Sequence, residues 1–139
     1  MKLKSKISKI VHSFTSTQWK LFSVVWTIIL LFLSLLSSQQ ASKLSIDLIG
    51  FDKLAHLIFY CILCFSWMMA LVPFKYKHFV IFTAIVTLGI MVEFAQLRMG
   101  KGRSYEYYDM LANTAGTLMG IYLFGKLSHN IRNEAIPSN

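Results

Sequence analysis

Four long apolar stretches divide this chain, and each is close to the length of a membrane-spanning helix. An α-helix needs about 20 predominantly apolar residues to cross a hydrocarbon core of about 30 Å. The fourth stretch is less uniformly apolar because it carries YEYYDMLANTAG. The stretches run from Trp19 to Ser38, Leu54 to Val72, His78 to Leu97 and about Tyr105 to Phe124. This pattern predicts an all-α integral membrane protein built as a four-helix bundle.

The composition agrees with lipid as the solvent around these helices. Hydrophobic residues make up 55% of the 139 residues and charged residues only 14%, whereas soluble domains carry about 25% charged residues. The first apolar stretch is longer than the roughly 7–15 apolar residues of a signal peptide, so we expect it to remain as a membrane helix. We therefore predict a basic tail over residues 1–18, a transmembrane domain over 19–125 and a flexible tail over 126–139.

The basic residues predict how the chain is oriented in the membrane. The net charge is +8, and five lysines lie within the first 20 residues. No basic stripe interleaved with aromatic residues follows them, which argues against nucleic acid as a partner. With the N-terminus inside, nine Lys and Arg residues lie on the inner side and five on the outer side. The positive-inside rule then predicts that both termini lie in the cytoplasm. We expect the lipid bilayer to be the main partner of the protein.

Polar side chains interrupt the apolar pattern at the same ends of three predicted helices. Residues three or four apart share one face of a helix, and a short loop makes the third and fourth helices antiparallel neighbours. The pairs that share a face are Asp52 with His56, Glu93 with Gln96, and Asp109 with Asn113, while Lys53, Arg103 and Glu106 lie beside them. All these groups fall at one membrane depth. We therefore predict a shared polar site at the outer face.

Purely structural explanations exist for several of these residues. Asp52 is suited to stabilise the N-terminus of its helix through the helix dipole. Glu93 lies about one turn inside its span, where an ion pair with Arg103 or Lys101 is an alternative to a functional role. Acidic residues inside membranes usually face the bundle interior and have a function or a partner. The convergence of three polar clusters favours a common site over several separate structural contacts.

Two sequence patterns predict packing instead of chemistry. Gly116 and Gly120 form a G-x-x-x-G sequence, which lets two membrane helices approach closely. Cys61 and Cys64 form a C-x-x-C pair in the middle of an apolar run, and no second pair is present to complete a zinc site. We therefore expect both cysteines to pack inside the bundle as small apolar residues.

Three sequence blocks resemble the VanZ-like family of small bacterial membrane proteins. The blocks are FDKLAHLIFY, GIMVEFAQ and GRSYEYYDMLANTAGTLMG, and together they cover about residues 50–120. The resemblance implies a location in the bacterial cell envelope, as a multi-pass protein of the inner membrane. At the level of the family it also implies a link to antibiotic resistance, namely reduced susceptibility to teicoplanin, a lipid-tailed glycopeptide. It implies no particular reaction for the residues of these blocks.

The favoured interpretation is a non-enzymatic envelope protein that binds a lipid-linked, lipopeptide or glycopeptide-type ligand. Arg103 and Lys53 are suited to hold the phosphate or carboxylate of an anionic lipid or a cell-wall precursor. The predicted ligand-binding set also contains Asp52, His56, Glu93, Gln96, Glu106, Asp109 and Asn113.

The alternative is a membrane hydrolase or transferase that acts on a lipid-linked phosphate or a peptide. His56 would act as a general base and the Glu93 and Asp109 carboxylates would assist it. A divalent metal on these three residues and Asp52 fits this alternative. However, no H-E-x-x-H, P-loop or G-x-S-x-G motif is present, so we predict no cofactor and no metal. A transporter is disfavoured because the polar groups leave no continuous track across the bundle.

Overall fold

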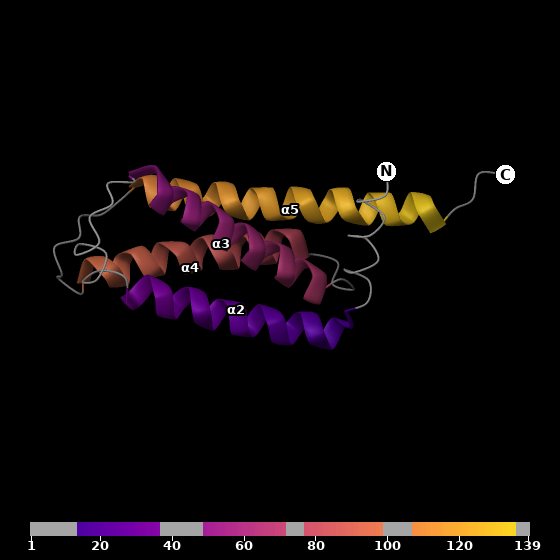
Figure 1. Cartoon of the computed structure of the whole chain (residues 1–139), viewed down its shortest axis with the longest axis horizontal. Coiled ribbons are helices and arrows are strands. Elements are labelled where there is room, and N and C mark those ends of the chain that lie inside the picture. Colours follow the sequence, from indigo (N-terminus) through magenta and orange to yellow (C-terminus); the bar gives the residue numbers. More distant parts are fainter. Residues whose placement is uncertain (1–13, 37–48, 72–76, 99–106, 136–139) are drawn as a thin grey trace.

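Four α-helices arranged as a bundle make up the part of the protein that the structure describes. The computed structural model describes residues 14–36, 49–71, 77–98 and 107–135. Within these ranges the helices are α2 (Ser16–Leu36), α3 (Ile49–Ala70), α4 (Lys77–Arg98) and α5 (Tyr107–Ala135). Figure 1 shows that their directions alternate, so that α2 and α4 end where α3 and α5 begin. The predicted all-α, four-helix architecture is confirmed.

Helix α3 is the central element of the bundle. It packs most extensively against α5 and also contacts α2 and α4. In Figure 1 it crosses the bundle obliquely, beginning beside α5 and ending near α2. The side chains that form the buried apolar core are Leu30, Tyr60, Leu63, Cys64, Met68, Ile81, Ile85 and Phe124. Half of these residues belong to α3, which explains why the other helices are arranged around it.

Tryptophan side chains join α2 to α3. The Trp26 indole ring stacks on the Phe59 ring with 5.2 Å between the ring centroids. Its Nε1 donates a hydrogen bond of 3.1 Å to the Phe59 carbonyl oxygen, and Trp67 Nε1 donates one of 3.3 Å to Thr27 Oγ1. A buried indole N–H needs such an acceptor because an unpaired polar group inside the bundle is costly. These contacts hold one face of α2 against α3.

The G-x-x-x-G residues set the close contact between α5 and α3. A Cβ atom on Gly116 would collide with the carbonyl oxygen of Leu57, and one on Gly120 would lie 2.7 Å from the carbonyl oxygen of Cys61. Only glycine therefore fits at either position without moving a helix backbone. Because the two helices approach so closely here, the polar residues at the start of α5 also come to lie against α3.

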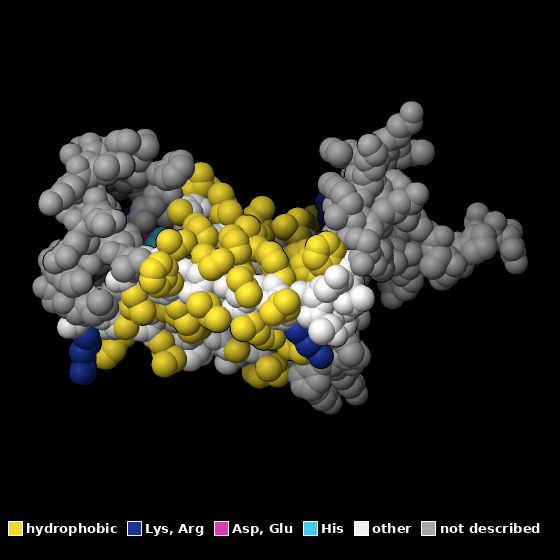
Figure 2. Space-filling view, turned by 60° about the horizontal axis from the view of Figure 1, so that its bottom comes forward, with side chains coloured by type: hydrophobic (Ala, Val, Ile, Leu, Met, Phe, Trp, Pro, Cys, Tyr) yellow, Lys and Arg dark blue, Asp and Glu magenta, His cyan; other side chains and the backbone are white. Residues whose placement is uncertain are grey.

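Most of the described surface is apolar. Three of the described helical segments are long and apolar enough to cross a membrane: Ser16–Leu35, Lys53–Ala70 and Lys77–Arg98. Figure 2 shows one face covered with hydrophobic side chains, with Lys and Arg side chains visible only toward its two ends. Such an extensive apolar surface is suited to lipid and not to water. The helices therefore embed the protein in a membrane.

Helix α5 is longer than the apolar stretch that predicted it. The sequence pattern indicates a span from about Tyr105 to Phe124, but the described helix runs from Tyr107 to Ala135. The tail that we expected to be flexible from residue 126 is helical up to Ala135. The segment KLSHNIRNEA contains no glycine or proline, and the first proline after Gly125 is Pro137. Helix formation can therefore continue after the apolar pattern ends.

Candidate functional site

Polar side chains from three helices meet at one end of the bundle, where α4 ends and α3 and α5 begin. We call this region the polar end and define it by Lys53, His56, Glu93, Asp109 and Asn113. Glu93, Asp109 and Asn113 are 5%, 6% and 2% exposed, respectively. Among the side chains that the structure describes, Glu93 and Asp109 are the only acidic ones. Because burial of charge is costly unless other groups compensate it, the contacts among these residues determine what the polar end can do.

The imidazole ring of His56 is held between α5 residues. Its Nδ1 lies 3.0 Å from Asn113 Oδ1, and its Nε2 lies 3.8 Å from Asp109 Oδ2. An amide oxygen only accepts hydrogen bonds, so Nδ1 carries the proton that it donates to Asn113. A neutral imidazole with this tautomer presents the lone pair of Nε2 toward the carboxylates.

An ion pair links α3 to α5 at the edge of this cluster. Lys53 Nζ lies 3.4 Å from Asp109 Oδ1, and the two side chains are 29% and 8% exposed. The two carboxylate oxygens of Asp109 thus face different partners, the Lys53 ammonium group and the His56 ring. Lys53 is therefore the more exposed member of this pair and lies at the edge of the cluster.

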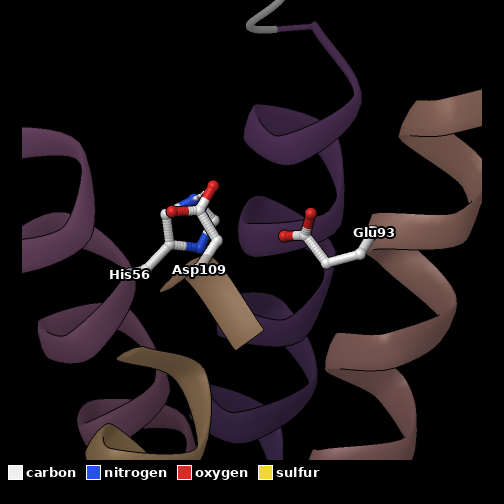
Figure 3. A group of neighbouring side chains, drawn as sticks. All are labelled: His56, Glu93 and Asp109. Atoms are coloured by element: carbon white, nitrogen blue, oxygen red, sulfur yellow. Dashed lines mark ion pairs between the residues drawn. The ribbon is translucent and has the colours of Figure 1, made fainter. Parts of the chain in front are cut away.

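Glu93 reaches the same cluster from α4. His56, Glu93 and Asp109 each place one nitrogen or oxygen atom within 4.8 Å of the others. In Figure 3 the Glu93 carboxylate points toward the neighbouring His56 and Asp109 side chains. A shared site requires Glu93 and Asp109 to lie within about two helix diameters, roughly 20 Å, of each other. In the structure, a carboxylate oxygen of Glu93 lies within 4.8 Å of one of Asp109, well inside this limit.

Gln96 has a structural contact at the polar end. Its Nε2 donates a hydrogen bond of 2.7 Å to the carbonyl oxygen of Ser34. The side chain therefore joins α4 to the last turns of α2, where that carbonyl lacks a complete set of helical partners. Although Gln96 belongs to the predicted ligand-binding set, the contact that the structure shows for it is one between helices.

Two buried donor groups adjoin Gly89, which lies one helical turn before Glu93 in α4. The Tyr60 hydroxyl and the Asn113 Nδ2 group have no hydrogen-bond partner among the described residues. Both lie 3.4 Å from the position that a Cβ atom would take on Gly89. We did not select Tyr60 or Gly89 from the sequence. The available signal was spacing, because Tyr60 follows His56 by four residues and Gly89 precedes Glu93 by four.

Three of the predicted site residues cannot be placed. The backbone of Asp52 lies in the first turn of α3, but its side chain is outside the described residues. Arg103 and Glu106 are also outside the described residues, as is Lys101. The roles assigned to these residues remain predictions.

The polar end combines groups with complementary chemical abilities. It contains an imidazole whose proton position is set by Asn113, two carboxylates, and the ammonium group of Lys53. Carboxylate oxygens and an imidazole nitrogen accept protons and also bind metal ions. Groups of these kinds can also donate and accept hydrogen bonds with hydroxyl, amide or phosphate groups.

The family match covers nearly the whole chain. Residues 4–128 match the family described as VanZ/LLP1. This range includes the polar end and both glycines of the G-x-x-x-G sequence. No curated protein and no solved structure matches the chain. The three sequence blocks predicted this relationship, and the chain belongs to the VanZ/LLP1 family.

Proposed function

We propose that this protein binds the headgroup of a lipid-linked, lipopeptide or glycopeptide-type ligand at its polar end. The observation that supports this proposal is the burial of charged and polar side chains from three helices in one cluster. Charged groups within membrane helices usually face the bundle interior and mark a functional site.

The surroundings of the polar end favour an amphipathic ligand. Exposed apolar side chains lie directly beside the site residues in the sequence: Leu54 follows Lys53 and is 50% exposed, and Phe94 follows Glu93 and is 51% exposed. An acyl or isoprenoid chain in the bilayer can lie along these side chains. Its headgroup then reaches the Lys53 ammonium group at the edge of the cluster.

The proposal includes an orientation in the bacterial inner membrane. With both termini in the cytoplasm, as the positive-inside rule predicts, the polar end faces the outer side, where cell-wall precursors and lipid-tailed antibiotics are found. A green fluorescent protein fused to the C-terminus should fluoresce, and alkaline phosphatase at the same position should be inactive. The opposite pair of results would place the polar end on the cytoplasmic side.

Ligand binding can be tested with the full chain in lipid nanodiscs. A fluorescent polyprenyl phosphate and a fluorescent short lipoglycopeptide serve as separate probes, and the neutral polyprenol serves as the control for partition into lipid. We expect saturable binding of at least one charged probe. Lys53→Gln should weaken it about tenfold, which corresponds to the loss of one charge-assisted contact. Lys126→Gln, at the opposite end, should leave it unchanged. Equal, non-saturable uptake of charged and neutral probes would falsify this proposal.

A second candidate function is catalysis on a lipid-linked phosphate or peptide. The observation that favours it is the His56 ring, whose Nε2 lies 3.8 Å from Asp109 Oδ2 while Asn113 holds the other ring nitrogen. A base oriented in this way can accept a proton from water or a hydroxyl group. Phosphate release from a polyprenyl diphosphate, abolished by His56→Gln, would establish this activity. Binding without turnover would leave the first proposal as the function.

A further inference from the structure

The metal-binding capacity of the polar end comes from three helices. His56, Glu93 and Asp109 belong to α3, α4 and α5, and each places one possible ligand atom within 4.8 Å of the others. Zinc binds imidazole nitrogen and carboxylate oxygen at about 2.0–2.2 Å, so two ligand atoms on one ion lie within about 4.4 Å of each other. The His56–Asp109 separation of 3.8 Å already meets that limit. Small side-chain rotations bring all three ligand atoms within reach of one ion.

The neighbouring groups orient two of these three side chains, His56 and Asp109, as metal sites require. Asn113 accepts the Nδ1 proton of His56, which directs the lone pair of Nε2 toward the carboxylates. Lys53 contacts Oδ1 of Asp109, so that the other oxygen, Oδ2, faces His56. Metal-bound histidines almost always donate their second ring proton to such a partner, and metal-bound carboxylates are in turn hydrogen-bonded.

The burial of both acids also favours a cation. Glu93 and Asp109 are 5% and 6% exposed. A divalent cation bound between the two carboxylates is attracted to both of them, and it also attracts the phosphate or carboxylate of an anionic ligand.

A further observation is a pair of buried donor groups at the inner side of the polar end. Tyr60 is 1% exposed, yet its hydroxyl group has no hydrogen-bond partner among the described residues, and the same is true of Asn113 Nδ2. Both groups adjoin Gly89, one turn from Glu93. Buried polar atoms are normally paired with protein or water. Their position suits oxygen atoms, from water or a ligand, that complete the coordination of an ion.

We propose that His56 Nε2, Glu93 and Asp109 bind one divalent cation, with Tyr60 and Asn113 placed to contact its remaining oxygen ligands. One nitrogen and carboxylate oxygens favour zinc or manganese over magnesium or calcium, which prefer oxygen ligands alone. Three protein ligands leave positions open for a ligand phosphate or carboxylate. This proposal deepens the proposed function and rests on it in identifying the polar end as the binding site.

The first experiment measures metal binding without any lipid ligand. Tag-free full-length protein in detergent is treated with a chelator, dialysed, and titrated separately with Zn²⁺ and Mn²⁺ by calorimetry. Bound metal is then counted by elemental mass spectrometry. We expect one ion per chain, and substitution with Co²⁺ should give the visible absorption of a nitrogen–oxygen site. Wild-type protein that retains neither ion in stoichiometric amount would overturn the proposal.

Variants locate the ion. Glu93→Gln and His56→Ala each remove one ligand and should weaken binding more than about 100-fold, while Asn113→Ala removes an orienting partner and should weaken it about tenfold. His78→Ala is the matched control, because His78 is an exposed histidine at the opposite end of α4. Circular dichroism verifies that each variant is helical. If a ligand variant does not fold, Asn113→Ala decides: an unchanged affinity and Co²⁺ spectrum would overturn the proposal.

A combined measurement separates this proposal from the proposed function. Polyprenyl phosphate binding in nanodiscs is compared between chelator-treated and metal-loaded protein. Lipid binding that needs the metal supports both proposals. Stoichiometric metal binding without lipid binding supports the cation site and contradicts the proposed function. Lipid binding by protein that retains no metal contradicts the cation site alone.

Discussion

The two halves of α5 both contain polar residues, but for different physical reasons. In the first half Asp109, Asn113, Gly116 and Gly120 are all buried against the rest of the bundle. In the second half Lys126 and Ser128 are exposed, and their hydrogen bonds go to Tyr122 Oη and the Gly125 carbonyl oxygen of the same helix. Polarity in the first half marks contact with the rest of the bundle, whereas Lys126 and Ser128 in the second half lie on an exposed face of the helix.

This difference shows why hydropathy alone describes α5 poorly. Both halves lower the average hydropathy of the helix, and α5 is not among the described segments that qualify as membrane spans by length and composition. Its first half is nevertheless the part that packs closely against α3. The glycines, which contribute little to hydropathy, determine that packing. Substitutions of the same kind in the two halves should therefore have opposite or very different effects.

The largest expected effect is that of Gly116→Ala. The new Cβ would collide with backbone atoms of Leu57, which cannot move aside by changing a rotamer. We expect a loss of about 3 kcal/mol or more in the free energy of unfolding, at the upper end for overpacked positions. The change can be measured by thermal unfolding in detergent, followed by tryptophan fluorescence and circular dichroism. An unchanged unfolding midpoint would mean that α3 and α5 do not approach as closely as described.

The next largest effect is expected for Asn113→Ala. This substitution removes the oxygen that accepts the Nδ1 proton of the half-buried His56 ring, and so deletes a contact between α3 and α5. Such a loss costs about 1–3 kcal/mol. The matched control is Thr114→Ala, whose hydroxyl donates only to the Met110 carbonyl oxygen of its own helix. The control should change stability by less than about 0.5 kcal/mol, and equal effects of the two substitutions would contradict the buried contact with α3.

Periodicity predicted the convergence of the polar residues, but not all of its members. His56, Glu93, Asp109 and Asn113 could be selected because charged or amide groups are rare in apolar helices. Tyr60 could not, because a tyrosine in an apolar stretch is equally suited to the core, where its ring does lie. The four-residue spacing between His56 and Tyr60 becomes informative only once Gly89 of α4 is known to lie beside the Tyr60 side chain.

Helix ends and inter-helix contacts were less predictable than helix existence. Three apolar stretches predicted α2, α3 and α4 to within a few residues. The end of α5 was missed because the segment after Gly125 is polar but still compatible with a helix. The bond from Gln96 to Ser34 was also unpredictable, since it depends on where α2 ends relative to α4.

A smaller effect of opposite sign is expected for Gly125→Ala, which makes the same change as Gly116→Ala in the other half of α5. Among the described residues, no atom outside the neighbouring turns of its own helix lies within 4 Å of the position that a Cβ would occupy on Gly125. Replacing a glycine inside a helix by alanine stabilises the helix by about 0.5–1 kcal/mol when space allows. The unfolding midpoint should therefore rise slightly. A fall comparable to that of Gly116→Ala would show that the second half of α5 is also tightly packed.

The smallest effect is expected for Lys126→Gln, which changes an exposed lysine in the second half of α5. Its effect on stability is to be compared with that of Lys53→Gln at the polar end. Lys126 is exposed, and its contacts are with the Tyr122 ring and hydroxyl group of the same helix. Substitutions at such surface positions usually change stability by less than about 0.5 kcal/mol. Lys53→Gln makes the same change beside the buried Asp109 and removes an ion pair between two helices. It should lower the unfolding midpoint clearly more than Lys126→Gln, and a reversed order would mean that the Lys53–Asp109 pair does not hold α3 to α5.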